Sequence, residues 1–156
     1  MKGFTDADYA GCIVSRKSRS GFVFLLNGAP ITWSSKRQSV VAQSTTEAEY
    51  VALNHGSREA VWLHNMLNQL DLKISCIQIF VDNQSTIRLA LNADHHNRTK
   101  HIDIRYHYVR DIVLKELIKL NYVNTHDQLA DIFTKPLPIQ TVCAMRERLN
   151  IVSDTK

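Results

Sequence analysis

Four acidic residues occupy positions from which their carboxylates could share metal ions. Asp6 lies in the first strand-like stretch, Glu49 in a long helical stretch, Asp82 directly after a short apolar run, and Asp131 near the last helical stretches. Clustered carboxylates repel one another and strongly prefer a divalent cation that they can share. Such a cluster suits two magnesium ions that flank a phosphodiester, one activating water and the other stabilising the leaving 3′ oxygen. The predicted chemistry is therefore metal-dependent phosphodiester hydrolysis.

Each of these acids, taken alone, also has an ordinary explanation as a solvated surface residue. The segment STTE at 44–47 is a capping box, in which Glu47 reaches back to a backbone amide at the start of the helix. Glu49 has no such role, so we predict that Glu49 is the metal ligand and Glu47 a structural residue. Asp8 shares a strand face with Asp6 but lies one pleat further along, so it could support the metal ligands or face solvent, and the second role is favoured.

The elements that position these acids follow from the hydrophobic pattern. Strands are expected at 3–12, 21–26, 31–34, 77–81 and 118–123, with a turn at Asn27-Gly28. Helices are expected at about 45–70, 85–92, 102–117, 128–133 and 142–149. Gly56 weakens the first helix, where a bend or break is expected. Trp33 and Trp62 are expected to be core or part-core anchors rather than base-stacking platforms.

The acids can meet only if the first and fourth strands are neighbours. Parallel pairing through the long helix, with a right-handed crossover, would bring Asp6 and Asp82 together. We therefore predict an α/β fold in one folded unit, with residues 1–138 forming the domain and residues 139–156 forming its C-terminal helix and tail.

Composition limits the function classes. The 156 residues are 44% hydrophobic and 22% charged, with a net charge of +4, which permits a polyanionic partner without identifying one. Three scattered cysteines indicate a reducing compartment and no structural zinc. Without an apolar run long enough for a membrane span or a signal peptide, we expect an intracellular protein, in a cytoplasmic particle or the nucleus, that is not secreted. The sequence contains neither a nucleophile triad nor a nucleotide-binding loop, which disfavours covalent catalysis and NTP hydrolysis.

Five blocks resemble the ribonuclease H segments of copia-type retroelements: FTDADYAG at 4–11, STTEAEY at 44–50, VDNQ at 81–84, RTKHIDIRYH at 98–107 and QLADIFTKPL at 128–137. The resemblance extends from about residue 3 to about residue 149. It implies a ribonuclease H-like fold, a five-stranded mixed sheet flanked by helices, and an acid set in the order Asp, Glu, Asp, Asp. Asp6, Glu49, Asp82 and Asp131 match that order.

The same resemblance implies a function. It indicates an endonuclease that uses two magnesium or manganese ions, cuts the RNA strand of RNA–DNA hybrids, and leaves 5′-phosphate and 3′-hydroxyl ends. It also implies a reverse transcriptase upstream in the same polyprotein, so that this sequence is expected to be a fragment, a degraded element or an excised segment. Cellular relatives have a histidine before the last Asp, and His126 is the corresponding accessory candidate here.

Candidate contacts to nucleic acid lie in the connections. Polar groups near the acids could recognise 2′-hydroxyls, namely Ser44, Asn83 and Gln84. Basic residues could contact phosphates, namely Lys36, Arg37, Arg98 and Lys100, together with Arg16, Lys17 and Arg19. Any one of these residues could equally be an ordinary exposed loop residue.

Two alternatives to the nuclease remain. One is a catalytically idle domain of the same fold that binds nucleic acid or braces a reverse transcriptase. The other is a transposase or integrase, in which the decisive Glu is expected on a late helix. Here Glu49 precedes Asp82, and the late acid is Asp131, so the order of the acids argues against this second alternative.

Overall fold

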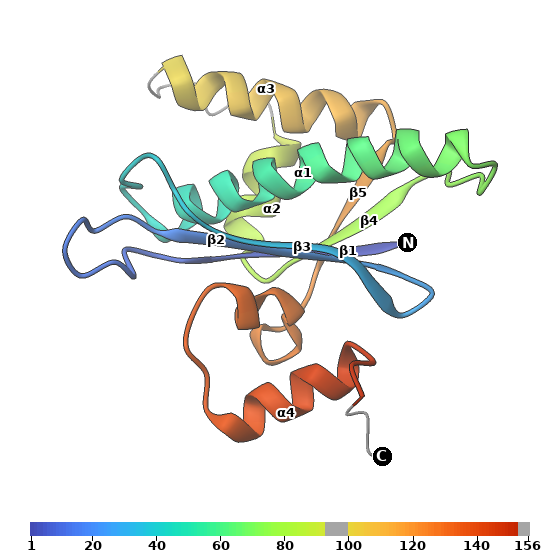
Figure 1. The fold of residues 1–156 in the computed structure, drawn as a ribbon. Helices are drawn as coiled ribbons and strands as arrows, with labels where there is room; N and C mark the ends of the chain where they lie inside the picture. Colours follow the sequence, from blue (N-terminus) through green and yellow to red (C-terminus); the bar gives the residue numbers. More distant parts are fainter. Residues whose placement is uncertain (93–99, 153–156) are drawn as a thin grey trace.

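The computed structural model of the chain describes residues 1–92 and 100–152, and it leaves the side chains of 100–104 and 106 undescribed. A central sheet separates two layers (Figure 1): α1 (Thr45–Gln69), α2 (Gln84–Leu91) and α3 (Lys100–Leu114) cover one face. The short 3-10 turn η2 (Leu129–Phe133) and the helix α4 (Ile139–Arg148) lie against the other.

The sheet has five strands in the order β3-β2-β1-β4-β5. Their bounds are β1 Lys2–Asp8, β2 Arg19–Leu26, β3 Ala29–Arg37, β4 Ile77–Val81 and β5 Ile118–Tyr122. The first three strands pair antiparallel, whereas β4 is parallel to both β1 and β5. The five-stranded mixed sheet and the parallel pairing of the first and fourth strands are therefore confirmed.

The β2–β3 hairpin turns where the sequence predicts it. Asn27 and Gly28 both have positive φ, of 51° and 85°, as the two-residue type I′ turn requires. The strands that flank this turn pair from Leu26 and Ala29 outward. This hairpin places β3 at the free edge of the sheet, next to the strand that pairs with β1.

Helix α1 begins at a capped end and runs without interruption for 25 residues. The Ser44 hydroxyl accepts from the Glu47 amide at 3.1 Å, and the Glu47 carboxylate accepts from the Gln43 amide at 2.8 Å. Gly56 does not break the helix, so the break that its low propensity allowed is absent. A Cβ at Gly56 would clash with the Thr5 methyl group, so this glycine lets α1 lie close against β1.

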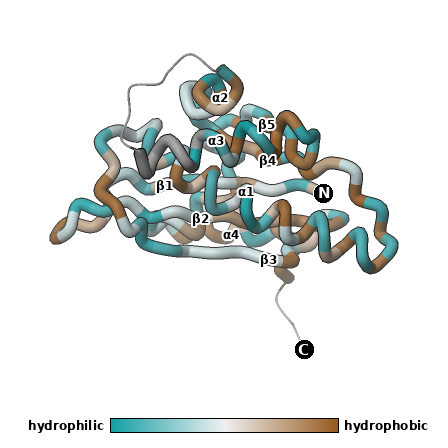
Figure 2. The backbone as a smooth tube through the Cα atoms, turned by 90° about the horizontal axis from the view of Figure 1, so that it is seen from above, coloured by the Kyte–Doolittle hydropathy of each residue, from teal (hydrophilic) through white to brown (hydrophobic). Residues whose placement is uncertain are grey.

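Two hydrophobic clusters fill the spaces on either side of the sheet. The larger includes Phe24, Leu53, Leu63 and Ile79 between the sheet and α1–α3, and the smaller joins Phe4 and other residues to η2 and the C-terminal segment. Seen from above, α1 crosses the middle of the sheet, α2 and α3 lie toward the β4–β5 side, and β3 extends beyond the helices (Figure 2). Among the described residues, no helix is long and apolar enough to cross a membrane.

Some predicted details differ from the structure. Trp33 and Trp62 are 59% and 55% exposed, so neither is a core anchor. Trp33 belongs to the edge strand β3, and Trp62 lies on the outer side of α1. The predicted helix at 102–117 begins at Lys100 and ends at Leu114, before Glu116 adopts a positive φ of 56°. The helix expected at 128–133 is a 3-10 turn, and the terminal helix begins at Ile139, directly after Pro138.

Candidate metal centre

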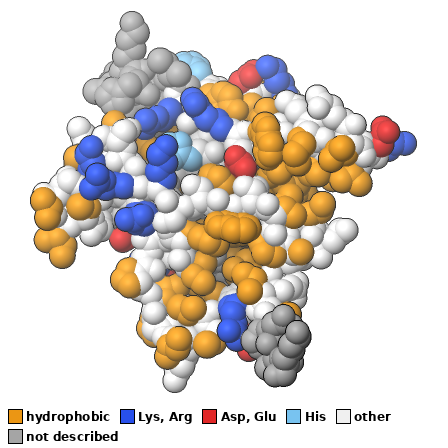
Figure 3. Space-filling view, viewed as in Figure 1, with side chains coloured by type: hydrophobic (Ala, Val, Ile, Leu, Met, Phe, Trp, Pro, Cys, Tyr) orange, Lys and Arg blue, Asp and Glu red, His pale blue; other side chains and the backbone are white. Residues whose placement is uncertain are grey.

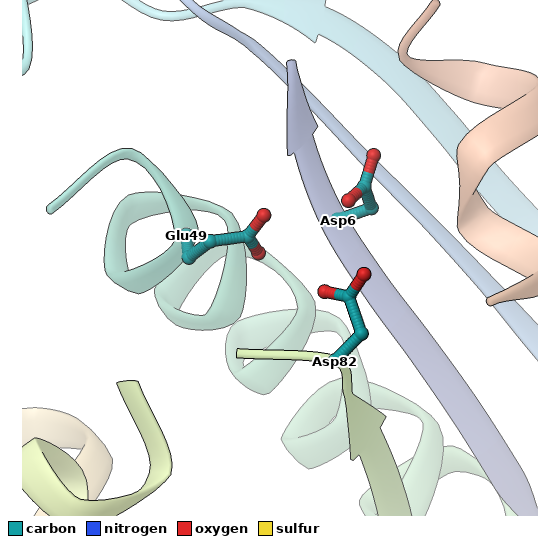
Figure 4. Close-up of side chains that lie close together, drawn as sticks. All are labelled: Asp6, Glu49 and Asp82. Atoms are coloured by element: carbon teal, nitrogen blue, oxygen red, sulfur yellow. The ribbon is translucent and has the colours of Figure 1, made fainter. Parts of the chain in front are cut away.

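Three carboxylates from three elements meet at the ends of the central strands. Asp6 is on β1, Glu49 is in the second turn of α1, and Asp82 follows the last residue of β4. Each offers one oxygen, and these oxygens all lie within 4.8 Å of one another. Figure 4 shows the Glu49 side chain extending from the helix toward the two aspartates on the neighbouring strands. The parallel pairing of β1 with β4 places both aspartates at the same end of the sheet.

Glu49 is the most deeply held of the three. It is 7% exposed, and one of its oxygens accepts from the Ala7 amide at 3.2 Å. The other oxygen, Oε2, is buried and has no hydrogen-bond partner in the described structure. Burial, and then the negative charges of Asp6 and Asp82, raise the pKa of Glu49 well above its ordinary value. A cation beside Oε2 would relieve both causes.

Asp82 is more open but experiences the same repulsion. Burial raises its pKa, and the charge of Asp6 adds to that shift, whereas a hydrogen bond from Thr125 and the charge of Lys135 act in the opposite direction. Thr125 begins the 3-10 turn η1 (Thr125–Asp127), which follows β5. The connection after β5 therefore contacts this acid through a threonine.

Asp131, on η2, does not belong to the group of three but lies next to it. Lys135 forms an ion pair with its Oδ2 at 3.0 Å, while Oδ1 is buried with no described hydrogen-bond partner. Burial, followed by the charge of Asp6, raises the pKa of Asp131 to about 6. The Thr134 hydroxyl donates to Asp6. Through Thr134 and Lys135, the segment after η2 contacts two of the predicted acids.

The site has the chemistry of a hard-cation centre. All its candidate ligands are carboxylate oxygens, which suit magnesium, manganese and calcium. Two buried oxygens without partners, Glu49 Oε2 and Asp131 Oδ1, fit donors that await a cation. Asp6, Glu49 and Asp82 could hold one ion, and Asp131 is placed to contribute to a second beside Asp6.

Several residues predicted to contact nucleic acid have structural contacts as well. The Ser44 side chain caps α1, and the Asn83 side chain caps α2 by accepting from the Thr86 amide at 3.0 Å. Gln84 is exposed at the start of α2, where its carbonyl accepts from Arg88 at 3.3 Å. Ser44 and Asn83 adjoin the elements that present Glu49 and Asp82, so both remain near the carboxylates.

The predicted cations are distributed more widely. Lys36 and Arg37 are both exposed, and because they are consecutive residues of β3 they point to opposite faces of the sheet. Lys36 shares the α1 face, whereas Arg37 lies opposite Arg19 on the other. Arg98 falls outside the described residues. Lys100 begins α3, and its side chain is not described.

His126 lies in η1, its side chain 92% exposed, with its Nδ1 3.4 Å from an Asp127 oxygen. Thr125, beside it in the chain, contacts Asp82 instead. Sequence reasoning did not single out Thr125, Thr134 or Lys135. A signal was present for Thr134 and Lys135, because both belong to the block at 128–137. Lys135 also follows Asp131 by four residues.

This architecture is similar to that of several solved ribonuclease H structures. The N-terminal RNase H domain of Rv2228c from Mycobacterium tuberculosis superposes with a TM-score of 0.61 at 13% identity, over 94% of this chain and 95% of that one. LC11-RNase H1, solved in complex with an RNA/DNA hybrid, gives 0.57 at 13% identity, over 85% and 92%. The chain therefore has the ribonuclease H fold.

No family model matches the chain. Its sequence is nevertheless similar to one segment of much longer polyproteins. It is 45% identical over 138 residues to the retrovirus-related Pol polyprotein of transposon TNT 1-94 from Nicotiana tabacum, covering 88% of this chain and 10% of that protein. With the polyprotein of transposon RE2 from Arabidopsis thaliana, the identity is 39% over the same shares. The chain is homologous to one segment of these copia-type Pol polyproteins and spans about a tenth of their length.

Proposed function

We propose that the chain is a metal-dependent endonuclease that hydrolyses the RNA strand of RNA–DNA hybrids. The observation that carries this proposal is the meeting of Asp6, Glu49 and Asp82 within 4.8 Å, with Asp131 beside them. A neighbour of the same fold was solved with an RNA/DNA hybrid, which supports the choice of substrate. Homology to Pol polyproteins supports a role in reverse transcription inside the cell, with a reverse transcriptase upstream in the same polyprotein.

In this proposal the chain supplies an oxygen-lined site and holds it in place. Two magnesium or manganese ions, when bound, would lower the pKa of a water molecule and offset the charge that develops on the phosphate. Asp6 and Asp82 are fixed by strand ends, and Glu49 by the Ala7 amide, so little reorganisation is needed when substrate binds. Thr134 and Thr125 orient Asp6 and Asp82 through their hydroxyls.

A divalent-metal titration with three parallel substrates tests the proposal. The wild-type chain should cut the RNA strand of a labelled hybrid in magnesium or manganese, leaving 3′-hydroxyl ends, and should leave double-stranded DNA intact. Double-stranded RNA should be cut far more slowly. Failure to cut a hybrid in either metal, at hybrid concentrations well above the dissociation constant, would favour the idle binding domain.

A further inference from the structure

A hollow with basic residues in its wall lies outside the carboxylate group, between the edge of the sheet and α1. The hollow has a volume of about 230 Å³, and its lining residues are Ser20, Phe22, Ser34, Lys36, His55 and Arg58. They come from β2, β3 and α1, and none of them is acidic. We call this hollow the β3 pocket. Figure 2 shows that β3 lies beyond the helix that covers the middle of the sheet.

Positive charge faces the β3 pocket from three elements. Lys36 comes from β3, Arg58 from α1, and Arg105 of α3 lies close enough to act on the His55 ring. Burial first, and then the charges of Arg105, Lys36 and Arg58, lower the pKa of His55. Figure 3 shows Lys and Arg side chains gathered around a histidine below α3, on the side where α1 begins.

The cations of the pocket have few acidic partners. Arg58 lies over the Tyr108 ring, with its guanidinium carbon 5.4 Å from the ring centroid, and this contact leaves its N–H groups available to an anion. Arg105 has a buried guanidinium nitrogen, Nη1, with no described hydrogen-bond partner. The acid that follows Arg58 in the chain, Glu59, accepts from the Thr32 hydroxyl at 2.7 Å. Within the part of the chain that the structure describes, the hollow therefore combines cations for which no ion pair is given with the serine hydroxyls of its wall.

The pocket lies within reach of a duplex bound at the carboxylates. Asp6 pairs with Gly21, and Gly21 pairs with Ser35, which lies between the lining residues Ser34 and Lys36, so one row of the sheet runs from the acid to the strand that forms the pocket wall. Two strand spacings make that row about 10 Å long. The six residue steps from Glu49 to His55 span about 9 Å along α1. A duplex carries one phosphate per strand for about every 3.4 Å of its axis, so several phosphates fall within this distance.

We propose that the β3 pocket binds a backbone phosphate of the duplex whose reacting phosphate lies at the carboxylates. The inference rests on the proposed function for its ligand class, and it adds a binding subsite that holds the duplex about 10 Å from the cut. Guanidinium groups suit such a phosphate because their paired N–H donors match two of its oxygens. Lys36 adds a point charge at the mouth of the hollow.

Binding to a short labelled RNA–DNA hybrid in EDTA tests the pocket without cleavage. The variants are Lys36→Gln, Arg58→Gln and the double variant, and the matched control is Lys119→Gln, which removes the same charge from the exposed opposite edge strand β5. Each pocket variant should lose roughly fivefold in affinity, as expected for one ionic contact in water. The salt dependence of binding should also weaken, by about 0.9 in log–log slope if one phosphate contact is lost.

A second measurement locates the contact. Each phosphate of the hybrid is replaced in turn by an uncharged methylphosphonate. Wild-type protein should bind less tightly when one particular phosphate is replaced. The same replacement should not weaken binding by the double variant. Because Arg58 also packs on Tyr108, melting temperatures are recorded for all variants, and Lys36→Gln, whose side chain is exposed, carries the test if Arg58→Gln unfolds.

The outcomes separate the pocket from the catalytic proposal. If both pocket variants bind the hybrid as tightly as Lys119→Gln, the pocket proposal is overturned, even where wild-type protein cuts. A different result would be that the wild type never cuts in magnesium or manganese, while the pocket variants bind less tightly and no longer respond to the methylphosphonate that weakens wild-type binding. In that case the nuclease proposal fails and the pocket proposal stands. If the wild type does not bind the hybrid at all, both are overturned.

Discussion

The two sides of the acidic site differ in how their charge is balanced. On one side, Asp6, Glu49 and Asp82 converge from two strands and a helix, and a buried oxygen of Glu49 is left without a partner. On the other side, Asp131 lies in a 3-10 turn and is paired with Lys135 at 3.0 Å. No ion pair is described for the first side, whereas the second has a counter-charge from the chain on one of its oxygens, although Asp131 Oδ1 is also buried without a described partner. Metal-dependent properties should therefore depend on the first side more strongly.

The largest effect we expect is a loss of cleavage when a carboxylate of the first side is replaced. Asp82→Asn and Asp6→Asn should each lower hybrid cleavage in magnesium on the order of a thousandfold, because they remove charge that holds the ions and stabilises the transition state. Hybrid affinity should change little, since ground-state binding comes mainly from Lys and Arg on phosphates. Single-turnover cleavage and anisotropy measure the two quantities. A parallel loss of both would mean that the carboxylates act in binding.

Stability without metal gives the next largest effect. The pKa of Asp131 is raised from 3.8 to about 6, and that of Glu49 is raised well above 4.5. The folded state then binds more protons than the unfolded chain, so the free energy of unfolding should fall as pH rises through about 4 to 6 and beyond. Magnesium should reverse this loss at neutral pH.

Thermal melts in EDTA across this pH range, repeated with magnesium, measure the effect. Asp82→Asn and Glu49→Gln should raise the melting temperature at neutral pH in EDTA, since each removes one of several crowded like charges. A lower melting temperature for both variants would show that their carboxylates stabilise the metal-free fold.

The same comparison explains what could be predicted from the sequence. Asp6, Glu49 and Asp82 belong to elements with strong signals: an alternating strand, a capped helix and an apolar run that ends in an acid. Those patterns predict the elements, and the parallel pairing was expected as the condition under which the acids could meet. The break allowed for at Gly56 does not occur because propensity ignores tertiary contact, and here the missing side chain is what permits close packing on Thr5.

The second side was harder to predict. The segment 128–133 was expected to be a helix, but it is too short, and too close to Pro136 and Pro138, to continue beyond a 3-10 turn. The partnership of Asp131 with Lys135 depends on that turn and on burial against the sheet, which periodicity does not encode. The β3 pocket was missed for a similar reason, because its walls come from three segments far apart in the sequence.

Lys135 provides an intermediate effect that tests the second side directly. Lys135→Gln leaves Asp131 buried without its counter-charge, so the melting temperature in EDTA should fall. Magnesium binding, followed by calorimetry, should tighten, because a positive charge that faces Asp6, Asp82 and Asp131 has been removed. Lys115→Gln, which breaks an exposed ion pair with Asp111, is the matched control and should change neither property appreciably. Unchanged metal affinity in Lys135→Gln would show that the two sides are electrostatically independent.

The smallest effect separates two neighbouring glutamates of α1. Glu47 accepts from the Gln43 amide at the start of the helix, whereas Glu49 faces Asp6 and Asp82. Glu47→Gln keeps an acceptor oxygen and loses only a charge near the helix N-terminus, which is worth about 0.3–1 kcal/mol. The melting temperature should therefore fall by about 1–4 °C with or without magnesium. Cleavage should stay within about threefold of wild type, since a loss of that size in stability leaves the folded population almost unchanged. Glu49→Gln makes the same chemical change two residues along the chain, yet it should abolish cleavage and raise the metal-free melting temperature. If Glu47→Gln instead abolished cleavage while its fold remained intact, the capping assignment would be wrong and both glutamates would belong to the metal centre.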